Sequence, residues 1–286
     1  MGLLGIFYLL LCTVSFSVLD VCRKKLAITY SPYRILTLVM GAQIPLYALW
    51  YILSPQKEVN LDLYSFWGAS NILFNLAANL LIVRSLQISP LSNAIPLLAL
   101  SPTFSLLFQP FFHIAIHPIQ ILGGMVIFAG ALILNGIPKL KSKVDRGLIM
   151  MTFAALCCGI LILLDRRSLR YASIPFHGLV QTVGMTTLCL ALERIYKIPH
   201  GEMNMSLKQA PWRYWIGASV FAFTAGVGQL SSLSYFDPAT VESVKRAMVL
   251  FLSVSFGFIF FKEPLTRRKI IGIFFMSLGI ILSSRH

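Results

Sequence analysis

Long apolar runs, each close to 20 residues, follow one another along nearly the whole chain. A helix that crosses the hydrocarbon core of a bilayer needs about 20 apolar residues. The runs predict ten transmembrane helices, at roughly 2–26, 33–53, 64–85, 90–112, 119–137, 147–169, 176–195, 212–233, 238–261 and 269–284. The links between them are short, so we expect an all-α membrane protein with no soluble domain.

The composition agrees with a membrane protein. Hydrophobic residues make up 57% of the chain and charged residues only 12%, whereas soluble domains average about 25% charged residues. The net charge of +14 would suggest a nucleic-acid partner in a soluble domain. Here the cations stand mainly between apolar runs, where topology signals are expected. We therefore expect the lipid bilayer as a partner and no nucleic acid.

The order of landmarks along the chain indicates an internal repeat. The prolines Pro90 and Pro238 align when residues 85–100, SLQISPLSNAIPLLAL, are compared with residues 233–248, LSYFDPATVESVKRAM. In both copies we expect a small polar cap before the proline and one long apolar helix after it. Other landmarks recur in the same order: Gly123 and Gly130 match Gly272 and Gly279, and Lys24 with Pro32 matches Arg167 with Pro175. The chain is therefore predicted to hold two units, 1–137 and 147–286.

Each unit holds five predicted spans, which is an odd number, so the two copies enter the membrane from opposite sides. Such an inverted repeat places a binding site near the midplane, between the halves, and permits alternating access. The predicted fold is an all-α membrane protein with ten transmembrane helices arranged as two inverted five-helix repeats.

The spans, the repeat, the later glycines and the motif Phe261-Lys262-Glu263-Pro264-Leu265-Thr266 together resemble the EamA-type group of the drug/metabolite transporter superfamily. The resemblance covers nearly the whole chain and implies a transporter. The first repeat departs from the pattern, because His113–His117 stands where the Glu-Pro-Leu-Thr element belongs. The chain also lacks a P-loop and any recognisable spacing of catalytic groups. We therefore expect no enzyme and no ATP-driven pump, and no cofactor.

The distribution of cations leaves the orientation open. Seventeen Lys and Arg residues fall on one predicted side and five on the side that holds both termini. The positive-inside rule then places the termini outside, whereas the resemblance implies cytoplasmic termini. We expect a multi-pass protein of a bacterial inner membrane, present as a monomer or homodimer.

Three charged residues, Glu242, Lys245 and Arg246, begin the ninth span and share one side of its helix. Charges inside a membrane helix normally face a bundle interior or a wet cavity. Lys245 and Arg246 resemble the Lys-Arg pair of the triose-phosphate and nucleotide-sugar translocators, where the pair contacts phosphate. We expect the cations to bind an anion while Glu242 orients them. Alternatively, the charges snorkel to lipid headgroups.

Two further charged clusters end the first and sixth spans. They comprise Asp20, Arg23, Lys24 and Lys25, and Asp165, Arg166, Arg167 and Arg170. These clusters could gate the path or draw in anions, or simply anchor helix ends at the interface. Lys24 and Arg167, which match in the repeat, are the preferred substrate-binding candidates among them.

A polar stripe marks the third span, where Asn71, Asn75 and Asn79 recur every four residues. In lipid such a stripe faces protein or water, so it either lines the substrate path or links helices. Weaker candidates are Gln43, Gln181 and Gln229, each solitary on its span. The five histidines show no ligand spacing and the five cysteines show no CxxC, so no metal site is predicted.

These features favour a secondary-active transporter for a small polar metabolite or a lipid-linked headgroup, with an anionic or phosphate-bearing group. An amino-acid or metabolite exporter is the first alternative, and a non-transporting membrane scaffold is the second. A scaffold would send Lys245, Arg246 and Asn75 into separate helix contacts, whereas a transporter would aim them into one cavity.

Overall fold

The fold is that of a computed structural model, which describes residues 3–55, 59–114, 116–135, 145–195, 211–262, 264 and 266–283. The helices in chain order are α1 (Leu3–Ala27), α2 (Pro32–Gly41), α3 (Ile44–Leu53), α4 (Leu61–Ile88), α5 (Leu91–Ala94), the 3₁₀ helix η1 (Ile95–Leu100), α6 (Ser101–Phe108), the 3₁₀ helix η2 (Gln109–Phe112), α7 (Pro118–Asn135), α8 (Arg146–Ser168), α9 (Ile174–Ile195), α10 (Trp212–Ser232), α11 (Pro238–Phe261) and α12 (Arg267–Ser283). The regular secondary structure of these parts is helical, apart from an isolated β-bridge between Val59 and Ala172.

Each predicted apolar run, as far as it is described, falls on one helix or on consecutive helices. Residues 2, 136–137 and 284 of these runs lie outside the described residues. Within the described residues, six segments are long and apolar enough to cross a membrane: Leu3–Ala27, Pro32–Leu53, Leu61–Ile88, Leu91–Phe112, Arg146–Ser168 and Ile174–Ile195. Residues Pro118–Leu134 form a shorter apolar helix. The chain is thus an integral, multi-pass membrane protein, since long apolar helices are stable in lipid because they satisfy their own backbone hydrogen bonds.

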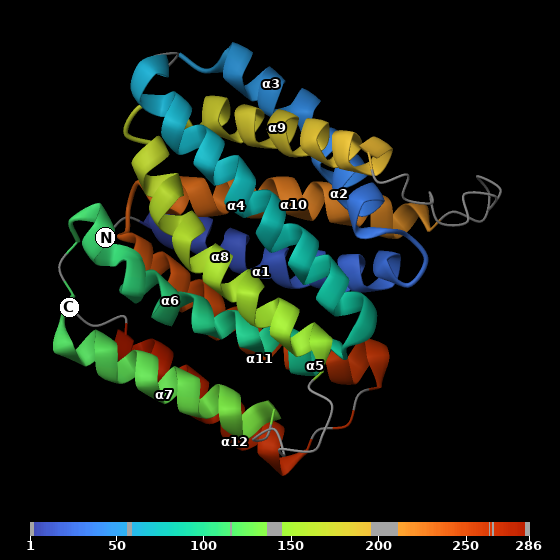
Figure 1. The fold of residues 1–286 in the computed structure, drawn as a ribbon, viewed down its shortest axis with the longest axis vertical. Coiled ribbons are helices and arrows are strands. Elements are labelled where there is room, and N and C mark those ends of the chain that lie inside the picture. The colour runs from blue at the N-terminus through green and yellow to red at the C-terminus, as the bar shows by residue number, and fades with distance from the viewer. Residues whose placement is uncertain are drawn as a thin grey trace.

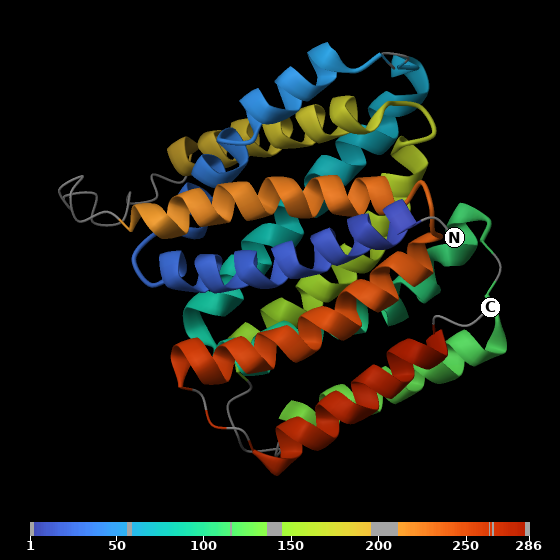
Figure 2. The same ribbon diagram turned by 180° about the vertical axis from the view of Figure 1, so that it is seen from behind.

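Helices of the two halves of the sequence pair with one another. The main partners are α1 with α10, α4 with α8, α7 with α12, and α2 and α3 with α9. Figures 1 and 2 show α7 and α12 along one edge of the bundle, with α3 and α9 at the opposite edge. The halves therefore interlock, and the centre of the bundle is built from both.

The glycines that marked the repeat are helix-packing residues. A Cβ atom on Gly279 of α12 would lie only 2.6 Å from the carbonyl oxygen of Gly123 on α7. A Cβ atom on Gly130 of α7 would lie 2.8 Å from the carbonyl oxygen of Gly272. Small residues allow close approach of membrane helices, so these glycines permit α7 and α12 to pack backbone to backbone.

The run 90–112 is not the single long helix that the repeat predicted. It is divided into α5, η1, α6 and η2. Three prolines within the run, Pro96, Pro102 and Pro110, each remove a backbone donor and obstruct an α-helical turn. The expected cap at Ser89 is also wrong, because its hydroxyl instead donates to the Asp145 carboxylate at 2.9 Å.

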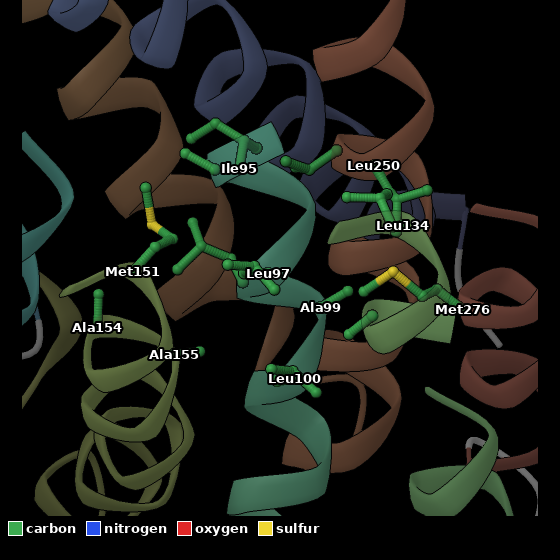
Figure 3. Close-up of a cluster of buried hydrophobic side chains, with 14 of the residues drawn as sticks. Ile95, Leu97, Ala99, Leu100, Leu134, Met151, Ala154, Ala155, Leu250 and Met276 are labelled. Carbon is green, nitrogen blue, oxygen red and sulfur yellow. The ribbon is translucent and has the colours of Figure 1, made fainter. Parts of the chain in front are cut away.

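The 3₁₀ segment η1 lies at the centre of the largest apolar cluster. Figure 3 shows Leu97 and Leu100 of this segment between Met151 of α8 on one side and Leu134 and Met276 on the other. All five side chains are at least nine-tenths buried. This packing holds the irregular segment in place from both sides.

The start of α11 forms as predicted. Asp237 lies in extended backbone and its Oδ1 accepts a hydrogen bond from the Thr240 backbone N–H at 3.1 Å. Pro238 is the first helical residue, where its missing N–H costs nothing. This cap sets the residue at which α11 begins, and so places the charges in its second and third turns.

The run 33–53 also departs from one continuous helix. It breaks between α2 and α3 at Ala42 and Gln43, next to Pro45. The break brings the Gln43 side chain to the interior, where it is 3% exposed.

Candidate functional site

A central cavity of about 150 Å³ lies among helices of both halves. Among the described residues, its charged or titratable lining residues are Asp20, Arg23, Tyr47, Cys158, Asp165, His177, Lys245 and Arg246. By the measure in which one water molecule needs roughly 10–15 Å³, the space suits a small polar molecule.

The charges on α11 form one buried group. Glu242 is fully buried and pairs with the Lys245 Nζ at 2.5 Å and with the Arg246 Nε at 2.7 Å. The predicted shared side is therefore confirmed. Lys245 and Arg246 are 4% and 7% exposed, so neither cation reaches out to headgroups.

Two polar residues from other helices hold this group in place. Ser101, the first residue of α6, donates its hydroxyl to Glu242 Oε1 and accepts from the Arg246 Nε at 2.8 Å. Gln229 on α10 accepts from the Lys245 Nζ at 2.8 Å. The break at Pro102 starts a new helix at Ser101, which places that hydroxyl beside the carboxylate.

A second group lies near the end of α1. Arg23 pairs with Asp20 at 3.8 Å and donates from Nη2 to the Asn79 Oδ1 at 2.6 Å. Both charged side chains are buried, at 3% and 5% exposure. The fixed charge of Arg23 is thus neutralised inside the bundle and tied to α4.

A third group surrounds Asp165, near the end of α8. Asn71 and Gln229 donate to its carboxylate at 2.6 and 2.8 Å. The His177 Nε2 lies 3.2 Å from Asp165 Oδ1, and the His177 Nδ1 lies 2.8 Å from the Tyr64 hydroxyl. Gln229 therefore touches both Asp165 and Lys245, and joins this group to the charges on α11.

The asparagine stripe on α4 connects the groups along one wall. Asn79 donates to the Asn75 Oδ1 at 2.6 Å, and Asn75 donates to Gln181 at 3.4 Å. Asn75 and Asn79 line the cavity, whereas Asn71 reaches Asp165. The stripe both lines the cavity and links helices.

The model of the EamA-like transporter family matches the chain twice, over residues 3–136 and 145–285. The chain belongs to the EamA-like transporter family. It is thus a membrane transporter of the drug/metabolite type, built from two copies of one unit. Members of this family are transporters and not enzymes.

No curated protein matches this family member. A solved structure titled only "Crystal structure of protein" aligns with 99% of this chain and 97% of its own, at 13% identity and a TM-score of 0.68. At that identity the likeness shows the fold alone.

Three predicted site residues of this EamA-like transporter do not line the cavity: Glu242, which pairs with the two cavity-lining cations, and Lys24 and Arg167. The Lys24 ammonium donates to the carbonyl oxygens of Leu86 and Ser89, the latter at 2.7 Å. It therefore caps the end of α4, where carbonyls lack helical partners. The Arg167 guanidinium lies over the Trp67 ring, 5.3 Å from its centroid. Both residues follow the cavity-facing carboxylates along their helices and turn away from the interior.

Several residues that line the cavity carry only a weak signal in the sequence. Gln43, Gln181 and Gln229 are solitary on their helices, and His177 has no ligand spacing, yet all four face the cavity. Their common signal is a polar side chain alone within an apolar run. Such a residue is costly in lipid and therefore faces the interior.

Proposed function

We propose that this EamA-like transporter is a secondary carrier that moves a small polar metabolite with an acidic group through the central cavity. In this proposal ten spans form two inverted five-helix repeats, 1–137 and 147–286, and the cavity opens alternately to each side. An ion or substrate gradient drives transport, as across a bacterial inner membrane.

The observation that carries the proposal is the convergence of Lys245, Arg246 and Asn75 on one cavity. A scaffold would have directed them into separate helix contacts. The direction of the helices supports the inversion: in Figure 1, α1 runs away from the N-terminus and α8 runs back toward it. The carboxylates near the ends of these helices, Asp20 and Asp165, therefore lie toward opposite sides of the bundle.

The chemistry of α11 favours an acidic group on the substrate. The bonds to Glu242 and Ser101 use the Nε of Arg246. A guanidinium can bind a carboxylate or phosphate in a bidentate manner through its two terminal nitrogens, which these bonds do not use. Lys245 supplies a compact positive charge in the same cavity wall.

An amino acid is the second candidate substrate. Asp20 and Asp165 line the same cavity as Lys245 and Arg246. The carboxylates could bind the ammonium group of an amino acid, and the cations could bind its carboxylate. The small volume of the cavity makes a lipid-linked phosphate, held by its headgroup, the third candidate.

A thermal-shift screen of the purified full-length protein tests the proposal. The compounds are phosphorylated sugars, nucleotides, amino acids and lipid phosphates. A ligand at 100 times its Kd stabilises the folded state by about 2.7 kcal/mol. We expect an acidic compound to raise Tm in the wild type and in Lys24→Ala, but not in Lys245→Ala or Arg246→Ala.

Lys24→Ala is the matched control because Lys24 lies outside the cavity. If an acidic compound stabilises Lys245→Ala and Arg246→Ala as strongly as the wild type, these cations do not bind the substrate. If no compound of any class stabilises the protein, the carrier proposal loses its support. A shift from amino acids alone selects the second candidate.

A further inference from the structure

The Asp165 carboxylate is buried beside a partner whose charge can change. Its residue is 5% exposed, and among the described residues its ion pair is with His177. Its other two donors, Asn71 and Gln229, are neutral amides. An ionised carboxylate is costly to bury without a compensating charge, so the charge of this group depends on whether His177 carries a second proton.

The surroundings of His177 suit both protonation states. The imidazole is fully buried between Asp165 and Tyr64. With a neutral ring, Nε2–H donates to Asp165 and Nδ1 accepts from the Tyr64 hydroxyl. With a protonated ring, both nitrogens donate, and the same hydroxyl turns to accept. A phenol can do either, whereas a backbone carbonyl in that place would satisfy only the protonated ring.

Among the described residues, the charged side chains that line the cavity or pair with those that do carry no net charge when His177 is neutral. The three cations are Arg23, Lys245 and Arg246, and the three carboxylates are Asp20, Asp165 and Glu242. A bound monoanion would leave one negative charge uncompensated in an enclosed, poorly solvated space. One proton on His177 restores neutrality.

Gln229 provides the physical connection between the two events. Its Oε1 accepts from Lys245 and its Nε2 donates to Asp165, both at 2.8 Å. The other titratable groups facing the pair are Tyr64 on α4 and Tyr47 on α3, whose ring packs against Gly178. An anion that draws Lys245 away from Gln229 therefore alters the hydrogen bonds of Asp165 directly.

We propose that Asp165 and His177 form a proton-binding site, and that one proton is taken up with each monoanionic substrate. The carrier is then a proton–anion symporter. The proton moves from water to the His177 imidazole, no covalent bond to carbon changes, and the same proton leaves with the substrate. This inference rests on the proposed function, because it requires the anion to bind at Lys245 and Arg246.

The test is an NMR titration of the full-length protein, labelled in histidine, in nanodiscs between pH 5 and 9. His177→Gln identifies the His177 signals, and His113→Asn serves as the matched control at an exposed histidine. The anion probe is inorganic phosphate, which is largely monoanionic near pH 6. We expect His177 to change protonation within this range, and saturating phosphate to strengthen proton binding about tenfold, by reciprocal coupling of the two sites.

The coupling should disappear in Lys245→Ala and in Asp165→Asn, and should persist in Lys24→Ala. A purely structural histidine would show no response to phosphate. A His177 signal that is unchanged between pH 5 and 9 overturns the proton site, and a titration that phosphate does not move overturns the symport. The two proposals fail separately: a thermal-shift ligand found together with an inert His177 refutes the proton site and leaves the carrier intact.

Discussion

The two acidic groups near the ends of α1 and α8 occupy similar places in the two halves and differ in one chemical respect. Asp20 and Asp165 are equally buried and both line the cavity. Asp20 is paired with Arg23, whose charge is permanent, whereas Asp165 is paired with His177, which is charged only when its ring carries a second proton. The comparison teaches that, at two similar places in the bundle, the partner of a buried carboxylate decides whether the charge of the site is fixed or can change.

The largest expected difference between the two sites is in stability. Asp20→Asn leaves the buried Arg23 without its carboxylate, and an arginine cannot release its proton. Loss of one member of a buried ion pair costs about 3 kcal/mol. Asp165→Asn should cost about 1 kcal/mol, because His177 can remain neutral and the amides of Asn71 and Gln229 can turn. Unfolding in detergent micelles measures both variants, and equal losses would remove the distinction.

A smaller difference is expected along the asparagine stripe. Asn79→Ala removes the acceptor of a 2.6 Å bond from Arg23 on another helix. Asn75→Ala removes a 3.4 Å interhelical contact with Gln181 and, within α4, the Oδ1 acceptor of Asn79. Interhelical polar bonds in membranes contribute about 0.6 kcal/mol on average and about 1.7 kcal/mol at most. We expect the Asn79 variant near the upper figure and the Asn75 variant near the average. The reverse order in the same unfolding assay would show that Arg23 does not depend on α4.

The smallest effect is expected at an exposed histidine. His113 has a φ of 58° at the end of η2 and its side chain is exposed. Asn is favoured in this left-handed conformation, so His113→Asn should change stability by less than about 0.5 kcal/mol. The same substitution at the buried His177 removes the imidazole between Tyr64 and Asp165 and should cost several times more. A large loss of stability in His113→Asn would show that the replacement of histidine by asparagine is itself destabilising, whatever the position.

The sequence predicts the helices of this fold well because lipid imposes a minimum apolar length. Breaks within helices were harder to predict. The continuous apolar pattern of the run 90–112 predicts one helix, although the run contains Pro96 and Pro102. The division at η1 also depends on packing against α8, which the sequence does not indicate. The break at Gln43 follows from a single proline in an otherwise apolar stretch.

The charged part of the site was predictable where it is local. Glu242, Lys245 and Arg246 lie within two turns, so helical geometry alone brings them together. The contacts of Gln229 and His177 join residues far apart in the sequence, and no spacing along one helix could indicate them. The repeat predicts Lys24 and Arg167 as site residues because they occupy matching positions in its two copies. A matching position does not determine which way the side chain points.

The pairing of each helix with a partner from the other half has a consequence for biogenesis. Since α1 packs on α10 and α7 on α12, the first half leaves the ribosome before its principal partners exist. Its buried polar groups, including Arg23, therefore stay in the bilayer or beside the insertion machinery without the partners of the second half until that half is inserted. The bundle therefore assembles late, because most of its helix contacts join residues far apart in the sequence. A chain whose synthesis stops midway would expose its polar interior to lipid, and membrane proteases could then degrade it.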